Sequence, residues 1–225
     1  MMPKSTVLVL NAPPSPALVQ ANPRGEGPAL PMPINDDNLS STSPSSGGCR
    51  LRSKLANFGD QFDIILTDFY DFEPNEQFDS IVIMGVIEHL PNYERVLKKF
   101  ASLLKPGGSV FLDGSAALKK YELSTFMVRH IYPGNHSFLV LDDLLNKLGK
   151  TELELMEVQN DRWSYFLTFK QWALNLEANK DYVQRTFGDF EFRKFRLYLW
   201  GAAYEFLTRN LDCYRLTLYK PRAAA

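Results

Sequence analysis

Aromatic residues are missing from the first quarter of the chain. The 16 Phe, 10 Tyr and 3 Trp of this 225-residue sequence all lie at or beyond Phe58, whereas nine of the 14 prolines precede it. A segment rich in Pro, Ser, Asn and Gly but without any ring buries too little apolar surface to offset its ordering entropy. We therefore predict a disordered low-complexity segment over residues 1–50 and one folded domain over residues 51–225.

Cysteine, surplus charge and long apolar runs are also scarce. Cys49 and Cys213 lie far apart, which excludes a disulfide framework and a CxxC metal site and makes a reducing compartment the default. The 25 Lys and Arg balance 26 Asp and Glu, so no charge surplus favours nucleic acid as a partner. No stretch reaches the roughly 20 apolar residues of a membrane span. These absences favour a cytoplasmic protein.

Strand and helix patterns alternate in the aromatic-rich part. Residues 62–66 and 80–85 are short apolar runs rich in β-branched residues, and the second is hydrophobic at successive positions, as in a parallel strand covered on both faces. Apolar residues then recur with the helical period over 92–104, and Lys105-Pro-Gly-Gly108 ends that helix. A third strand is predicted over 109–112.

Strand, helix, Gly-rich turn and strand make a βαβ crossover, which belongs to a doubly wound sheet. We therefore predict an α/β fold with a helical cap inserted after the third strand. Ligands bind such sheets outside the carboxyl ends of the strands, which directs attention to residues 67–69, 84–89 and 113–115. Further helices are predicted around 121–131, 139–148, 170–186 and 190–209, with strands near 153–158 and at 214–219.

Several ordered segments carry a family resemblance. The segments Leu66–Phe72, Phe78–Leu90 and Leu104–Gly108 resemble the second half of a class I S-adenosylmethionine-dependent methyltransferase. Three later segments are similar to the cyclopropane-fatty-acyl-phospholipid synthase and mycolic acid cyclopropane synthase family: Ile131–Gly134, Trp163–Trp172 and Arg196–Phe206. The resemblance implies an incomplete Rossmann-like sheet, S-adenosylmethionine as cofactor, and methyl or methylene transfer to an unsaturated fatty acyl chain of a lipid.

The cofactor loop of that family has no counterpart in this sequence. The family has a Gly-rich loop after its first strand and an acidic residue after its second. In roughly that place stands Val7–Pro14, whose prolines lack backbone donors. Either Val7–Leu10 is a degenerate first strand, or the first strands and helix are absent and residues 1–50 replace them through truncation or a gene-model error. We expect the second.

The resemblance assigns Glu88 and Tyr165 to a catalytic pocket that holds bicarbonate in the family. The residues alone also allow a helix N-terminus for Glu88 and a core position for Tyr165. Asp113 stands where the family has a histidine, and Ser115 where it has an isoleucine. A second carboxylate repels bicarbonate unless one of the two is protonated, so bicarbonate fits this site poorly and Asp113 is a candidate general base.

Four further residues are candidates on the cofactor side. The resemblance places Asp68 and Phe69 beside the adenine, although Asp68 alone also fits a solvated strand end. Met84 and His89 follow the next strand and are assigned to the same cofactor. His130 and His136 lack metal-ligand context, so no metal site is predicted.

The acceptor is the least constrained part of the prediction. The apolar positions of residues 190–209 fit one helix face, which is more often core than lipid-facing. The family's acyl tunnel implies a lipid acceptor and peripheral membrane contact. The alternatives are methyl transfer to another small or lipid acceptor, and a non-catalytic remnant or binding module.

Overall fold

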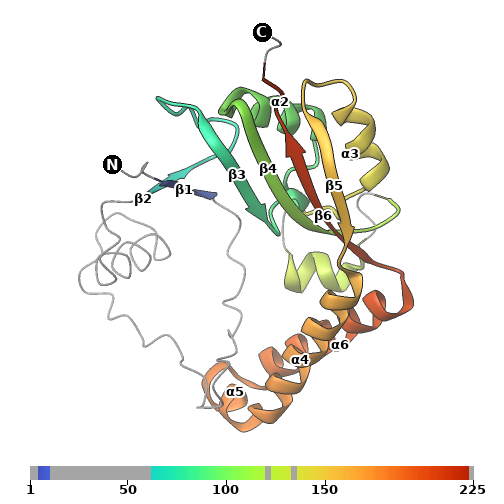
Figure 1. Ribbon diagram of the computed structural model, residues 1–225. Helices are drawn as coiled ribbons and strands as arrows, with labels where there is room; N and C mark the ends of the chain where they lie inside the picture. Colours follow the sequence, from blue (N-terminus) through green and yellow to red (C-terminus); the bar gives the residue numbers. More distant parts are fainter. Residues whose placement is uncertain (1–4, 11–61, 120–122, 133–135, 223–225) are drawn as a thin grey trace, which may run out of the picture. The chain divides into compact units, whose positions relative to one another are not determined.

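The computed structural model describes residues 5–10, 62–119, 123–132 and 136–222 (Figure 1). They fall into two compact units, of which the second begins at Pro74. In the first unit, strand β1 (Ser5–Leu10) pairs in parallel with β2 (Phe62–Thr67) along its whole length. β2 confirms the strand predicted over residues 62–66.

The prediction for the N-terminal segment needs one correction. Residues 5–10 were included in the predicted disordered segment, but they form β1, because their apolar run finds backbone hydrogen-bonding partners on β2. The remainder, residues 11–50, lies outside the described residues, and the boundary at residue 50 stays a prediction.

The second unit is built on a four-stranded sheet. Its strands are β3 (Phe78–Met84), β4 (Leu104–Ala116), β5 (Glu154–Asn160) and β6 (Asp212–Tyr219), in the spatial order β3-β4-β6-β5. β3 and β4 are parallel, whereas β6 is antiparallel to both of its neighbours. The predicted α/β fold is confirmed.

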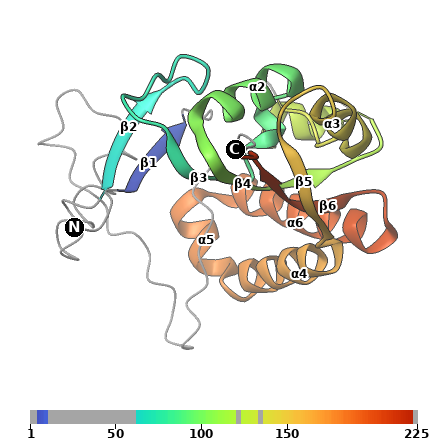
Figure 2. The same ribbon diagram turned by 45° about the horizontal axis from the view of Figure 1, so that its top comes forward.

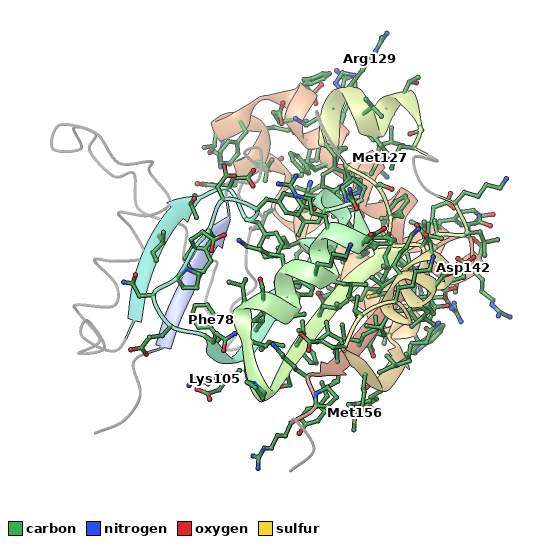
Figure 3. The ribbon with its side chains drawn as sticks, turned by 90° about the horizontal axis from the view of Figure 1, so that it is seen from above. Phe78, Lys105, Met127, Arg129, Asp142 and Met156 are labelled. Carbon is green, nitrogen blue, oxygen red and sulfur yellow. The ribbon has the colours of Figure 1, made fainter. Side chains whose placement is uncertain are left out.

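Helix α2 (Tyr93–Leu103) makes the crossover between β3 and β4. The side chain of Asn92 accepts a hydrogen bond from the Arg95 N–H and so caps the first turn. The predicted apolar face is buried, including Val96, Leu97 and Phe100. The chain then turns directly into β4, so the two parallel strands begin at the same end of the sheet, where Figure 3 labels Phe78 and Lys105.

Helices cover one face of this sheet and its carboxyl end. Figure 2 shows α2 and α3 (Leu141–Leu148) together on one face. The longer helices α4 (Arg162–Ala178) and α6 (Asp189–Thr208), with the short α5 (Lys180–Phe187) between these two in sequence, lie beyond the carboxyl ends of β3 and β4 (Figure 1). Within the described residues, no helix has both the length and the apolar character that a membrane span needs.

The helical cap comes later in the chain than predicted. Among the described residues between β4 and α3, the helical structure is the short η3 (Met127–Ile131), and α4, α5 and α6 are inserted between β5 and β6. The apolar face predicted for residues 190–209 does form core, because Tyr198, Leu199 and Phe206 of α6 are buried in one cluster with Phe169 of α4. The helix predicted over 170–186 is two helices, the first of which already begins at Arg162.

Candidate functional site

The carboxyl ends of β3 and β4 are tied together by one side chain. Gly85 follows β3 with a φ of +62°, a conformation that glycine adopts without steric cost and that lets the chain turn sharply. Its N–H donates to Oδ1 of Asp113 over 2.8 Å. Asp113 lies near the end of β4 and is only 7% exposed. The candidate base is therefore a buried carboxylate held in place by the neighbouring strand end.

Glu88 lies in the short helix η2 (Ile87–His89), directly after this turn. It is 5% exposed, and its Oε1 accepts a hydrogen bond from the Ser115 N–H over 2.7 Å. Gly114 makes this approach possible, because a Cβ there would lie 2.4 Å from Cγ2 of Ile87. Oε2 of Glu88 has no hydrogen-bond partner among the described residues.

Tyr165 reaches the same place from helix α4. Its hydroxyl donates a long hydrogen bond of 3.4 Å to Oδ2 of Asp113. The first turn of α4 is fixed to β6, because the Asp161 N–H donates to the carbonyl of Cys213 and the Tyr165 N–H donates to the carbonyl of Asp161. The predicted catalytic residues Asp113 and Tyr165 are therefore in contact.

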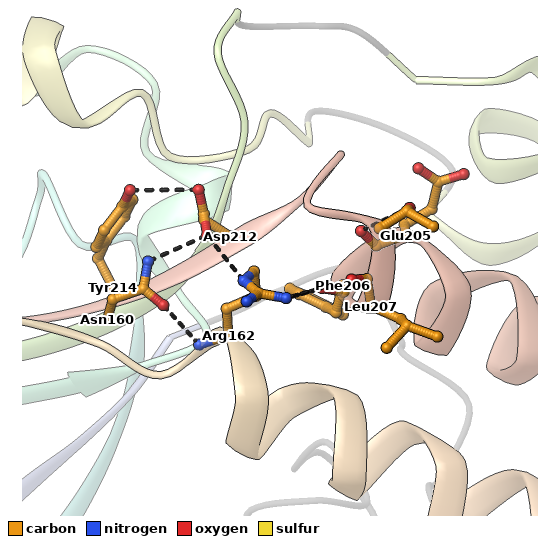
Figure 4. A network of polar contacts seen from close by, with 8 residues as sticks. Asn160, Arg162, Glu205, Phe206, Leu207, Asp212 and Tyr214 are labelled. Atoms are coloured by element: carbon orange, nitrogen blue, oxygen red, sulfur yellow. Dashed lines mark hydrogen bonds and ion pairs between the residues drawn. The ribbon is translucent and has the colours of Figure 1, made fainter.

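A polar network reinforces the start of α4 (Figure 4). The guanidinium of Arg162 donates to the Phe206 carbonyl over 2.6 Å and lies 3.7 Å from Oδ1 of Asp212. The backbone N–H of Arg162 donates to the side chain of Asn160. These contacts join β5, α4, α6 and β6 and so fix the orientation of the helix that carries Tyr165.

Burial dominates the electrostatics of this site. Removal from water raises the pKa of Glu88 from 4.5 to about 7, and the charge of Asp113 adds to the effect. Burial likewise raises the pKa of the Cys213 thiol to about 12 and lifts the pKa of the Tyr165 hydroxyl above its ordinary value. Near neutral pH the phenol and the thiol are therefore uncharged, whereas Glu88 is divided between its two protonation states.

Two tyrosines and a histidine beside this site were not predicted to act there. The hydroxyls of Tyr132 and Tyr198 are 2.6 Å apart, and the ring of Tyr132 stacks on His136 with 4.2 Å between centroids. His136 is 8% exposed, and neither ring nitrogen has a hydrogen-bond partner among the described residues. Burial lowers its pKa to about 4, so this imidazole is neutral.

The predicted cofactor residues are divided between the two units. Met84 ends β3 with 63% of its surface exposed, and His89 is partly buried with its ring 5.2 Å from that of His136. Asp68 and Phe69 lie in the first unit, where Oδ1 of Asp68 accepts from the Tyr70 N–H and Phe69 is buried. A shared role of these four residues in cofactor binding stays a prediction.

Comparison with known proteins agrees with the fold. A family model described as mycolic acid cyclopropane synthetase matches residues 45–216. A probable fatty acid methyltransferase of Pseudomonas putida is 27% identical over 184 residues, covering 77% of this chain and 46% of that protein. A hydroxymycolate synthase of Mycobacterium tuberculosis is 26% identical over 179 residues, covering 72% of this chain and 58% of that protein. The chain thus spans about half the length of these curated relatives.

Solved structures show the same fold. A cyclopropane synthase from Mycobacterium tuberculosis superposes with a TM-score of 0.71 at 19% identity, covering 80% of this chain and 67% of that one. A mycolic acid cyclopropane synthase in complex with SAH and CTAB gives a TM-score of 0.66 at 21% identity, covering 76% of this chain and 65% of that one.

Proposed function

The chain belongs to the mycolic acid cyclopropane synthetase family, and on that premise we propose that it transfers a methyl or methylene group from S-adenosylmethionine to the double bond of an unsaturated acyl lipid. The observation that carries the proposal is the convergence of Glu88, Asp113 and Tyr165 at the carboxyl ends of β3 and β4, where α/β sheets bind their ligands. The names of the fatty acid and mycolate relatives support a lipid acceptor.

The described residues fit one side of a cofactor site at the end of β3. A Cβ on Gly85 would meet no atom within 4 Å, and the neighbouring Met84 is exposed, so this strand end is open to a ligand. We propose Met84 and His89 as residues that hold the cofactor here, and Asp68 and Phe69 as its adenine contacts. When bound, S-adenosylmethionine supplies an electrophilic methyl group on a sulfonium centre.

The chain's own contribution is negative charge and a base. Positive charge develops on the acyl carbon as the alkene attacks, and the carboxylates of Glu88 and Asp113 stabilise it from a site that largely excludes water. Asp113 then accepts the proton released on ring closure. Its two oxygens are oriented for this by the Gly85 N–H and the Tyr165 hydroxyl, so the base needs little reorganisation.

We propose that Asp113 also takes over the role of base that the family resemblance implies for bicarbonate. An anion beside Glu88 and Asp113 would face two carboxylates in a buried setting, which is unfavourable. We therefore propose that this chain carries out proton removal with Asp113 and without a bound bicarbonate.

The Asp113→Asn variant tests this assignment, because the amide keeps an acceptor for the Gly85 N–H but removes the base. With S-adenosylmethionine and vesicles of unsaturated phospholipid, we expect turnover measured by mass spectrometry to fall by about a hundredfold or more. Tyr165→Phe should reduce turnover by no more than this factor. Intact activity in Asp113→Asn together with a higher cyclopropane yield in Asp113→His would show that Asp113 is an altered bicarbonate ligand and no base.

The cap carries the surface that we propose for contact with the lipid phase. A groove lined by residues of α4, α5 and α6 contains apolar Phe192, Leu197 and Trp200 together with basic Lys180, Arg193 and Arg196 and acidic Glu177. Leu197 is 61% exposed. Such an amphipathic surface supports peripheral contact with a membrane, which a vesicle flotation assay measures directly.

A further inference from the structure

The Glu88 site carries buried negative charge that no cation among the described residues balances. Glu88 and Asp113 are 5% and 7% exposed. Among the described residues, neither carboxylate forms an ion pair with Lys or Arg, and Oε2 of Glu88 has no hydrogen-bond partner at all. A buried carboxylate without a countercharge is costly, so the arrangement favours a ligand that brings positive charge.

An aromatic cluster reaches the Asp113 carboxylate through Tyr165. The Tyr165 hydroxyl contacts Asp113, and its ring lies 5.4 Å from that of Phe206 and 6.4 Å from that of Phe169. The charge of Glu88 also acts on the hydroxyls of Tyr132 and Tyr198. Ring faces attract cations, and carboxylates combined with aromatic rings are the side chains that recognise organic ammonium groups.

We propose that the Glu88 site accepts an aliphatic amine as a second class of methyl acceptor. The inference rests on the proposed function, from which it takes the sulfonium methyl donor. The bound ammonium ion first passes one proton to the Asp113 carboxylate, which frees the lone pair of the nitrogen. That lone pair forms the new C–N bond to the methyl carbon while the C–S bond breaks and its electron pair stays on sulfur, and the product leaves as the N-methylated ammonium ion.

The amine fits this site on grounds of charge. An ammonium group would pair with Oε2 of Glu88, whereas bicarbonate would add a third negative charge beside two carboxylates. A carbon cation that forms during alkene methylation and an alkylammonium ion carry the same charge on similar shapes. A site that stabilises the first therefore binds the second.

Binding is tested first, without the methyl donor. Hexyltrimethylammonium, which cannot be methylated, is titrated calorimetrically into the full chain. The titration is done at about pH 8, above the pKa of Glu88, so that this carboxylate is charged. The comparison probes are 1-hexanol and bicarbonate. We expect the ammonium to bind at least about tenfold more tightly than the alcohol. Glu88→Gln, which keeps an acceptor for the Ser115 N–H, should abolish that difference. The matched control Glu94→Gln removes an exposed acidic group on α2 that pairs with Lys98, and it should leave the difference intact.

Turnover is tested next, with S-adenosylmethionine and N-methylhexylamine, and N,N-dimethylhexylamine is detected by mass spectrometry. We expect product from the wild type and from Glu94→Gln, and at least about tenfold less from Glu88→Gln. Equal affinity for ammonium and alcohol, Glu88-dependent binding of bicarbonate, or ammonium binding without an N-methylated product would each overturn the inference. Amine product without any lipid product would overturn only the proposed lipid function, and lipid product without amine product only the present inference.

Discussion

Gly114→Ala tests whether the close approach of η2 to β4 builds the site. The added methyl group would lie 2.4 Å from Cγ2 of Ile87 and 3.4 Å from Cδ of Glu88. Ile87 is 1% exposed, so it has no free volume into which to move, and Gly114 itself is held in register with Tyr214 on β6. Relief therefore requires displacement of η2, and we expect the free energy of unfolding to fall by about 1–3 kcal/mol.

Urea unfolding followed by tryptophan fluorescence and circular dichroism measures this loss. Gly201→Ala is the matched control, because the same methyl group on α6 would meet no atom within 4 Å. In a helix interior that substitution should stabilise the protein by about 0.5–1 kcal/mol. If Gly114→Ala unfolded at the same urea concentration as the wild type, η2 would not pack as tightly as described, and the argument for how Glu88 is positioned would fail.

Two further predictions concern the buried polar groups. The pKa of Glu88 is about 7 in the folded protein against an ordinary 4.5, so the folded state binds this proton more tightly than the unfolded state. The stability that this group contributes is therefore fully present below pH 4.5 and is lost as the pH rises through 7. The free energy of unfolding falls by about 3 kcal/mol over this range. The titratable groups that face Glu88 are Asp113, Tyr165, Tyr132, Tyr198 and Cys213. When urea unfolding is measured as a function of pH, the Glu88→Gln variant should lack this loss of stability. A variant with the same pH profile as the wild type would contradict the assignment. Tyr198→Phe leaves the Tyr132 hydroxyl without its partner and should lower the free energy of unfolding by about 1–3 kcal/mol. Adding Tyr132→Phe in a double variant should restore part of that loss. If the two losses were instead strictly additive, the hydroxyl pair would not contribute to stability.

The sheet and its ligand-binding end could be predicted because their signals are local. Residues 81–84 of β3 are a continuous apolar run and α2 has one apolar face, so each pattern identifies its element to within a few residues. The rule that ligands bind beyond parallel strand ends then pointed to the segments that contain Glu88 and Asp113. In the structure, both carboxylates are buried at that edge of the sheet.

The helix that carries Tyr165 gave a weaker signal. Phe169 and Ala173 of α4 are buried, but Trp163 and Leu167 are exposed, so apolar residues lie all round the helix. Without an amphipathic pattern, the beginning of α4 at Arg162 could not be recognised. Tyr132 and Tyr198 could not be paired either, because 66 positions separate them and only the packing of α6 brings their hydroxyls together.

The placement of the site in one unit has a mechanistic consequence. Glu88, Asp113 and Tyr165 all lie in the unit that begins at Pro74, and backbone contacts from β6 fix the orientation of Tyr165. The groups that meet the acceptor are thus held by the sheet β3-β4-β6-β5 itself, whereas Asp68 and Phe69 belong to the other unit. Recognition of the acceptor by charge therefore depends on residues that all belong to the second unit. For that reason, binding of an alkylammonium ion can be measured in the absence of the methyl donor.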